Sequence, residues 1–246
     1  MTEKVRLDKF LTDEGFLASR SEAQAAILAG KVRVNGRVAS KASEKVSAAD
    51  EIEAEKAHPY VSRAALKLKR ALELFPINPT GLHCLDVGSS TGGFTEILLE
   101  AGAAQVVAVD VGRDQFHDLL RNDERVSLFE QTDARHLTAD MLSVPPQLIV
   151  CDASFIGLEK VLATAMTLAA TEAQLVALFK PQFQVGPKHV GKGGIVTDED
   201  AIETAKQAYI DWLSQNGWSP KGWAPSPITG SDGNQEWLSW AVRSQA

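Results

Sequence analysis

Cysteine, tyrosine and methionine are scarce in this chain, which has two, two and three of them in 246 residues. Both cysteines, Cys84 and Cys151, lie inside apolar runs that predict buried strands. This placement fits a reduced, cytosolic protein far better than a disulfide scaffold or a metal site. The five histidines also lack the spacing of metal ligands, so we expect no bound metal.

Long apolar runs are missing as well. No stretch approaches the ~20 apolar residues that a membrane-spanning helix needs. The N-terminus, MTEKVRLDKFL, is polar where a signal peptide would be apolar. We therefore expect a cytoplasmic protein without a membrane segment. Its length suits one catalytic domain and a small additional module.

Positive net charge is also lacking, because the formal net charge is −7. The charges are unevenly distributed, however. Residues 1–63 carry 11 basic and 10 acidic side chains, whereas the remainder carries 14 and 22. Between residues 16 and 45, six basic residues accompany only two acidic ones. Such a local patch can bind phosphates although the whole chain is acidic. A solvated face would have the same composition, so charge alone leaves both interpretations open.

The pattern of residues 5–53 predicts a small α+β module. Apolar residues at helical spacing predict a helix over 5–11 and a second helix that Ser19 or Ser21 caps. The alternating segment 31–38 predicts a hairpin around its Asn-Gly dipeptide.

Three segments of this module, RLDKFL, SRSEAQAAILAGKVRVNGRV and DEIE, resemble the S4 RNA-binding domain. The resemblance covers nearly all of residues 5–54. It implies that the second helix and the hairpin hold basic side chains against the backbone and shape of structured RNA. The side chains that it implicates are Arg20, Lys31, Arg33, Arg37 and Lys41. S4 domains accompany several activities, so the reaction must come from the rest of the chain.

After a helix that begins near Ser62, the next hundred residues alternate predicted strands and helices. We expect strands over 82–87, 105–110, 126–130, 147–152 and 174–179. This alternation predicts a doubly wound, Rossmann-like α/β domain with its ligand at the C-terminal strand ends. We expect an S4 module over 5–54, a linker over 55–61 and the α/β domain over 62–246.

A glycine-rich loop follows the first strand in DVGSSTGGF. Its glycines let the backbone approach a ligand and turn sharply into a helix. Ser90 occupies the position of the second glycine in a dinucleotide-binding fingerprint, which disfavours an oxidoreductase. The loop instead resembles the S-adenosylmethionine loop of class I methyltransferases, which have a mostly parallel seven-stranded sheet. That resemblance implies cofactor contacts from Asp86, Gly88, Ser89, Ser90, Thr91, Gly92, Gly93 and Phe94.

Aspartates follow the next strands. Asp110 closes the second strand, where a carboxylate can accept hydrogen bonds from ribose hydroxyls. Asp133 and Ala134 follow the third strand, where methyltransferases often contact adenine. A helix cap or a turn would explain either aspartate alone, but their joint placement favours a cofactor site. Asp152, after the fourth strand, belongs to the same set.

The segment DASFI around Asp152 leaves two interpretations. One is a relative of the Asp-Pro-Pro-Tyr motif that acts on amino groups of bases; the other is the aspartate of a ribose 2′-O-methyltransferase. The Pro-Pro dipeptide is absent. Lys67, Asp152, Lys180 and Glu236 match the Lys-Asp-Lys-Glu set of FtsJ-like ribose methyltransferases, which favours the second interpretation.

The motifs YVSRAALKL, DVGSSTGGFT, DASFI, LFKPQFQVG, GKGGIV and SPITGSDGNQEW are similar to the TlyA family, labelled hemolysin A or rRNA 2′-O-methyltransferase. This resemblance covers essentially the whole chain. It implies S-adenosylmethionine as cofactor, and ribosomal RNA or a ribosomal subunit as partner. The implied target is a cytidine of large-subunit rRNA, with small-subunit rRNA as a second candidate.

A ribose 2′-hydroxyl is a poor nucleophile near neutral pH and needs a base or an electrostatic partner. We assign this activation to Lys180. Burial of its side chain and the nearby Lys67 ammonium would lower the pKa of Lys180. Asp152 and Lys67 would position and tune it, and Glu236 would complete the network. The two carboxylates act in the opposite direction, so the net tuning stays open.

Further RNA contacts are expected from Phe155, Lys188 and Lys192. Phe155 can stack on the target base or fill the core, and the sequence favours neither. The segment 185–196 is too glycine-rich for a regular element, so we expect a mobile, substrate-facing loop with its lysines near phosphate. The five C-terminal tryptophans are expected to pack the last helix and strands.

Two other functions stay open. A non-catalytic, S-adenosylmethionine- and RNA-binding assembly factor would have the same motifs. A membrane-active hemolysin would need an export signal or an amphipathic membrane segment, and we find neither of these features in the sequence.

Overall fold

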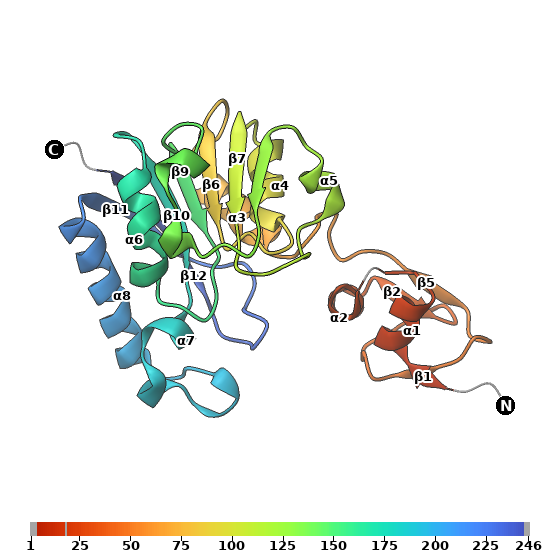
Figure 1. The fold of residues 1–246 in the computed structure, drawn as a ribbon. Coiled ribbons are helices and arrows are strands. Elements are labelled where there is room, and N and C mark those ends of the chain that lie inside the picture. The colour runs from red at the N-terminus through yellow and green to blue at the C-terminus, as the bar shows by residue number, and fades with distance from the viewer. Residues whose placement is uncertain (1–3, 18, 244–246) are drawn as a thin grey trace. The chain divides into compact units, whose positions relative to one another are not determined.

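The computed structural model describes residues 4–17 and 19–243. The chain divides into two compact units, Met1–Tyr60 and Val61–Ala246, drawn as ribbons in Figure 1. Within the described part of the chain, no helix is long and apolar enough to cross a membrane.

The first unit is a small α+β fold. Its elements are β1 (Val5–Arg6), α1 (Leu7–Asp13), α2 (Arg20–Leu28), β2 (Val32–Val34), β3 (Arg37–Val38), β4 (Lys45–Val46) and β5 (Ile52–Ala54). Strand β2 pairs antiparallel with both β3 and β5, and β1 pairs with β4. Buried aliphatic side chains from both helices and from β2 form one core.

The predicted elements of this unit are present, with one shift. The helix expected over 5–11 begins at Leu7, because the two residues before it pair as a strand with β4. Ser19 caps α2 by accepting a hydrogen bond from a backbone N–H of its first turn. Asn35 and Gly36 have φ values of 51° and 75°, as the predicted tight hairpin requires.

The second unit is built on a seven-stranded sheet with the order β11-β12-β10-β9-β6-β7-β8. Its strands are β6 (His83–Val87), β7 (Gln105–Val109), β8 (Val126–Phe129), β9 (Leu148–Cys151), β10 (Gln174–Phe179), β11 (Trp218–Pro225) and β12 (Trp237–Arg243). Strand β12 is antiparallel to both of its neighbours, and the other neighbouring pairs are parallel. The predicted mostly parallel, Rossmann-like sheet is confirmed.

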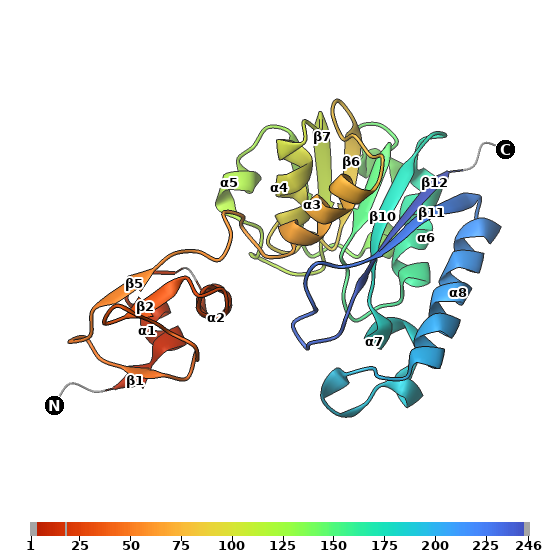
Figure 2. The ribbon, with the colours of Figure 1, turned by 180° about the vertical axis from the view of Figure 1, so that it is seen from behind.

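Helices cover both faces of this sheet. They are α3 (Ala65–Leu74), α4 (Gly93–Glu100), α5 (Asp118–Arg121), α6 (Leu158–Leu168), α7 (Pro181–Gln184) and α8 (Glu199–Gln215). Helices α6 and α8 lie in front of the sheet in Figure 1, and α3 and α4 lie in front of it in Figure 2. The central strands are therefore buried on both faces, which explains their nearly continuous apolar sequences.

The strand ends differ slightly from the prediction, and the difference matters for the site. Strand β10 has the predicted bounds, whereas β7 and β9 end one residue early. Asp110 and Asp152 consequently lie just beyond their strands. The tryptophans of α8, β11 and β12 pack around the predicted C-terminal elements, and Trp218 is fully buried. Cys84 and Cys151 are free and buried, as expected.

Candidate active site

A cavity of about 450 Å³ opens at the C-terminal ends of β6, β7 and β9. From the predicted cofactor set it is lined by Gly88, Ser90, Asp110, Asp133, Ala134 and Asp152. Gly88 has φ +80°, and a Cβ there would lie 2.9 Å from the backbone of Ala153. Only glycine therefore lets the loop after β6 lie this close to the end of β9. The volume is that of a small-molecule site.

Asp110 organises the rim of this cavity. Its carboxylate accepts hydrogen bonds from the backbone N–H groups of Ser90 at 2.8 Å and Gly112 at 2.6 Å. A carboxylate has about four acceptor positions, so Asp110 retains capacity for hydroxyl donors of a ligand.

Asp133 combines the two roles that its position suggested. It caps the short 3-10 helix η1 (Ala134–His136) by accepting the backbone N–H of Arg135 at 2.9 Å. The Arg135 guanidinium also binds this carboxylate, at 2.5 Å, and together these hydrogen bonds lower the pKa of Asp133 to about 2. The carboxylate still lines the cavity, and Arg135 lines it too.

Asp86 lies beneath the loop that follows β6 and does not line the cavity. Its side chain is fully buried, and Oδ2 accepts a hydrogen bond from the Thr95 hydroxyl at 2.7 Å, whereas Oδ1 has no partner. Burial raises its pKa to about 7. Of the other loop residues, Ser89, Gly93 and Phe94 line a second cavity, and Thr91 and Gly92 line neither.

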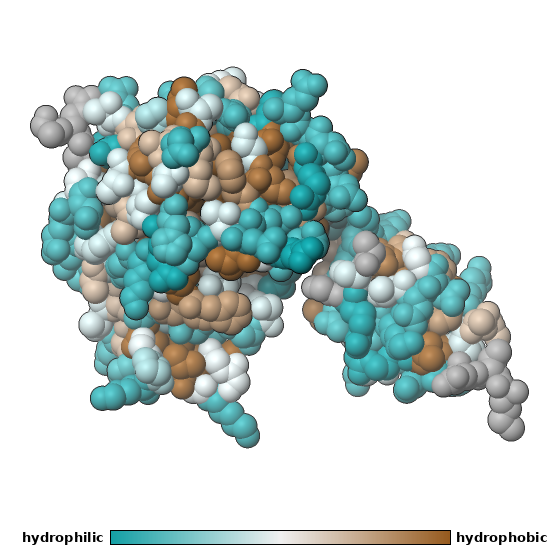
Figure 3. Space-filling view, viewed as in Figure 1, coloured by the Kyte–Doolittle hydropathy of each residue, from teal (hydrophilic) through white to brown (hydrophobic). Residues whose placement is uncertain are grey.

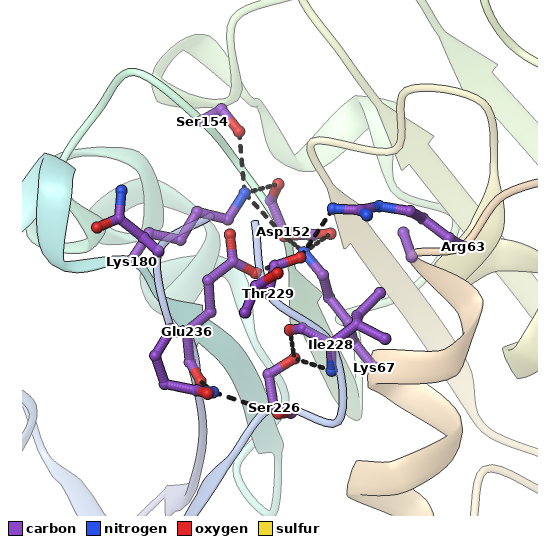
Figure 4. A network of polar contacts seen from close by, with 12 residues as sticks. Arg63, Lys67, Asp152, Ser154, Lys180, Ser226, Ile228, Thr229 and Glu236 are labelled. Atoms are coloured by element: carbon purple, nitrogen blue, oxygen red, sulfur yellow. Dashed lines mark hydrogen bonds and ion pairs between the residues drawn. The ribbon is translucent and has the colours of Figure 1, made fainter. Parts of the chain in front are cut away.

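The four residues of the predicted catalytic set converge from separate elements, as Figure 4 shows. Lys67 is in the first turn of α3, Asp152 follows β9, Lys180 follows β10, and Glu236 precedes β12. Because β10 and β12 are antiparallel with the last residue of one opposite the first of the other, Lys180 and Glu236 become neighbours. Their side chains and that of Lys67 are at most 7% exposed, and Asp152 is 12% exposed.

Asp152 bridges the two lysines. Lys67 Nζ lies 3.1 Å from Asp152 Oδ2 and 2.6 Å from Glu236 Oε2. Lys180 Nζ lies 2.8 Å from Asp152 Oδ1 and donates hydrogen bonds to the Asp152 carbonyl oxygen at 3.0 Å and to Ser154 Oγ at 2.9 Å. Two cations and two anions are thus enclosed together with a formal charge of zero.

Lys67 and Lys180 have different surroundings. Burial lowers the pKa of Lys67, but Asp152 and Glu236 raise it, and the net pKa lies above the ordinary value. Lys67 therefore stays an ammonium group that holds both carboxylates. Lys180 has one carboxylate partner and two neutral oxygen partners, so its nitrogen is the better placed of the two to exchange a partner for an incoming hydroxyl.

A second cavity, of about 350 Å³, contains all four of these residues. It shares Gly88, Ser90, Asp152, Ser154 and Phe155 with the first cavity. A ligand in the first cavity and a second molecule in this one would therefore meet at the end of β9, beside the two lysines. This arrangement suits transfer of a group from one molecule to the other.

Phe155 stands where the two cavities meet. Its side chain is 91% exposed, and its φ of 66° is unusual for a bulky residue. Its ring centroid lies 5.3 Å from that of Phe183. The alternative in which Phe155 fills the core is wrong. An exposed, strained aromatic residue beside a reactive centre is instead typical of a ligand contact.

Several residues of the second cavity were not predicted from the sequence, and Arg63 and Ser154 are two of them. Arg63 lines it and donates to the Thr229 carbonyl at 2.7 Å, and Ser154 contacts Lys180. Both belong to motifs that were singled out for another residue: Arg63 is four positions from Lys67, and Ser154 is two positions from Asp152. That proximity was the available signal.

The basic side chains predicted to bind RNA in the first unit are exposed or half-exposed. Arg20 donates to the buried Asp8 at 3.1 Å, and Arg6, which the sequence did not single out, donates to it at 2.9 Å. The other four are Lys31, Arg33, Arg37 and Lys41, which lie on the hairpin or next to it. The visible face of this unit is mostly hydrophilic in Figure 3.

Comparison with known families gives two matches. A model described as FtsJ-like methyltransferase matches residues 60–243, and a model described as S4 domain matches residues 5–52. The boundary between the matches falls near the division between the two compact units.

Individual proteins resemble the chain over nearly its full length. The 16S/23S rRNA (cytidine-2′-O)-methyltransferase TlyA of Mycobacterium tuberculosis is 43% identical over 242 residues, which cover 98% of this chain and 90% of that protein. Hemolysin A of Brachyspira hyodysenteriae is 39% identical, covering 95% and 98%. A solved structure of a hemolysin-named protein from Streptococcus thermophilus has a TM-score of 0.79 at 34% identity, covering 100% of this chain and 90% of the other.

Proposed function

Because the chain belongs to the FtsJ-like methyltransferase family and carries an S4 domain, we propose that it methylates a ribose 2′-hydroxyl of ribosomal RNA. The observation that carries this proposal is the enclosed set of Lys67, Asp152, Lys180 and Glu236 at the junction of two cavities. The similarity to a cytidine-2′-O-methyltransferase supports cytidine as the target nucleoside.

The first cavity fits S-adenosylmethionine. Gly88 leaves room for close approach to the loop backbone, Asp110 suits the ribose hydroxyls, and Asp133 with Ala134 suits the adenine. When bound, this cofactor supplies an electrophilic methyl group on a sulfonium. Asp152 lines both cavities, so the part of the site around Asp152 would face the methyl group of the bound cofactor.

The chemical step follows from the contacts of Lys180. A ribose hydroxyl that enters the second cavity would take a place at Lys180 Nζ beside the Ser154 hydroxyl. Lys180 would first release one ammonium proton to water, because an ammonium group cannot accept another. The hydroxyl oxygen would then take the methyl group from the sulfonium as the carbon–sulfur bond breaks, and the hydroxyl proton would pass to the Lys180 amine. Lys67 and Glu236 hold Asp152, and Asp152 holds Lys180, so positioning supplies much of the rate.

RNA recognition would involve both units. We propose that residues 5–54 form the RNA-binding domain, 55–61 the linker and 62–246 the catalytic domain. Phe155 offers an exposed ring on which an unpaired target base can stack. Arg63, Lys188 and Lys192 offer positive charge to the phosphates around it. An enzyme that modifies ribosomal RNA would act in the cytoplasm.

The proposal is tested by incubating the protein and methyl-labelled S-adenosylmethionine with ribosomal subunits, or with naked rRNA, from a strain that lacks the enzyme. We expect label in RNA with the wild type and far less label in the same time with Lys180→Ala. Cofactor binding without label in any rRNA would contradict the proposal and support the non-catalytic assembly factor.

A further inference from the structure

Glu236 is carried by a turn, residues 230–236, that lies against the catalytic cavity. Gly230, Ser231 and Asp232 of this turn line the cavity. A Cβ on Gly230 would lie 2.9 Å from Glu236 Oε1, so the turn packs directly on the catalytic carboxylate. The backbone N–H of Gly230 donates to the Asn234 carbonyl at 2.9 Å and closes the turn. Movement of the turn would therefore move Glu236. We refer to residues 230–236 as the catalytic turn.

Asn234 is a second buried residue of the catalytic turn, and it faces the segment between α7 and α8. It is 3% exposed, and both ends of its amide bind the backbone of residues 186–196. We refer to residues 186–196, which are separate from the loop after β6, as the glycine-rich loop. Oδ1 accepts the N–H of Val196 at 2.9 Å, and Nδ2 donates to the carbonyl of Gly194 at 2.8 Å. A buried amide group that loses its hydrogen-bond partners is destabilising, so both contacts hold the loop backbone at this position.

The glycine-rich loop has the composition of a segment that needs such an attachment. Gly186, Gly193 and Gly194 all have positive φ, between 76° and 83°. The loop lies between α7, which begins directly after Lys180, and α8, and its Lys188 and Lys192 are exposed. Glycines in these conformations lose much conformational freedom on ordering, and they provide no side chains with which to recover it.

We propose that Asn234 is a positioning residue that fixes the glycine-rich loop to the catalytic turn. The loop would then hold its lysines at a fixed position relative to Glu236 when RNA binds. Disorder of the loop would loosen the Glu236–Lys67 ion pair. This inference rests on the proposed function for the role of the loop, whereas the attachment itself is independent of it.

The test compares Asn234→Ala, Asn234→Asp and Asn216→Ala by hydrogen exchange and by steady-state methylation. Asn234→Asp keeps an acceptor for Val196 but places an oxygen against the Gly194 carbonyl, and it preserves side-chain volume if the alanine variant is unstable. Asn216→Ala is the control, because its amide caps the end of α8 by donating to Trp212. S-adenosylmethionine affinity and melting temperature are measured for each variant.

For both Asn234 variants we expect at least tenfold faster amide exchange within 190–196. We also expect the KM for RNA to rise about tenfold and kcat to fall by a similar factor, with cofactor Kd within twofold. Asn216→Ala should change none of these. Unchanged exchange would overturn the attachment, and faster exchange with unchanged KM and kcat would overturn the coupling. If the wild type methylates no rRNA, the proposed function fails instead, and the exchange data still decide whether Asn234 holds the loop.

Discussion

At the scale of single residues, the two buried lysines perform different tasks although they share Asp152. Lys67 contacts two carboxylates and keeps its proton, whereas Lys180 contacts one carboxylate, a carbonyl and a hydroxyl. A set with no net charge can be enclosed without an uncompensated ion, which would be costly to bury. Removing the side chain of any one of the four residues leaves such an ion, so single substitutions should greatly reduce methylation.

The first prediction concerns Lys180. In Lys180→Ala, single-turnover methylation should fall by a factor on the order of 100 to 10,000, as is usual for loss of an acid–base group. Affinity for S-adenosylmethionine should stay within twofold, because Lys180 does not line the first cavity. Rapid-quench kinetics and calorimetry measure the two quantities. A variant with the wild-type single-turnover rate would exclude Lys180 from the chemical step.

The second prediction concerns Asp86 and pH. Burial raises the pKa of this carboxyl from 3.8 to about 7 in the folded state. The folded state therefore binds this proton more tightly than the unfolded state, and the resulting stability is present below pH 4 and is lost as pH rises toward 7. Asp86→Asn removes the titration while it keeps a partner for the Thr95 hydroxyl.

We therefore expect Asp86→Asn to gain stability relative to the wild type as pH rises from 4.5 to 8, by several degrees in melting temperature. Thermal unfolding of both proteins across this range provides the comparison. A difference between the two melting temperatures that is constant with pH would show that Asp86 does not titrate there.

At the scale of elements, the close approach of the loop after β6 to the end of β9 determines the cofactor cavity. Gly88→Ala should raise the Kd for S-adenosylmethionine at least tenfold, because its Cβ would lie 2.9 Å from the Ala153 backbone. Gly81→Ala is the matched control, since Gly81 has φ +74° and nothing within 4 Å of an added Cβ. Both variants incur backbone strain of roughly 1–2 kcal/mol, but only the first should lose cofactor affinity. Equal affinities would contradict this account of the cavity.

Much of the fold was predictable at this scale because the signals are local. The hairpin of the first unit follows from Asn35-Gly36, and the central strands follow from apolar runs that a doubly covered parallel sheet requires. The neighbourhood of Lys180 and Glu236 was not predictable from local pattern, because it depends on β12 entering the sheet antiparallel to β10. Only the resemblance to FtsJ-like ribose methyltransferases indicated that these two residues belong to one site.

The candidate site was harder to predict for the same reason. Asp86 was expected at the cofactor, but it lies beneath the loop, since the position of a side chain relative to a strand end depends on register. Arg63 and Asn234 contact segments far away in the sequence, and such contacts leave no periodic signal.

At the scale of the whole molecule, a chain with net charge −7 must bind a polyanion through a local patch. We expect the combined substitution Arg33→Ala, Arg37→Ala and Lys41→Ala to raise the KM for RNA with little change in kcat. The slope of log KM against log salt should also become shallower by roughly 0.7–0.9 per lost phosphate contact. Arg70→Ala, which removes an exposed charge of α3, is the control. An unchanged salt dependence in the triple variant would place RNA binding elsewhere.

In the proposed reaction this molecule delivers the methyl group to a ribose oxygen rather than to a base. The most direct measurement digests the methylated rRNA to nucleosides and identifies the labelled product by mass spectrometry. We expect 2′-O-methylcytidine, whose methyl group stays with the ribose when the glycosidic bond breaks. Label that stays with the free base would contradict the assignment of Lys67, Asp152, Lys180 and Glu236.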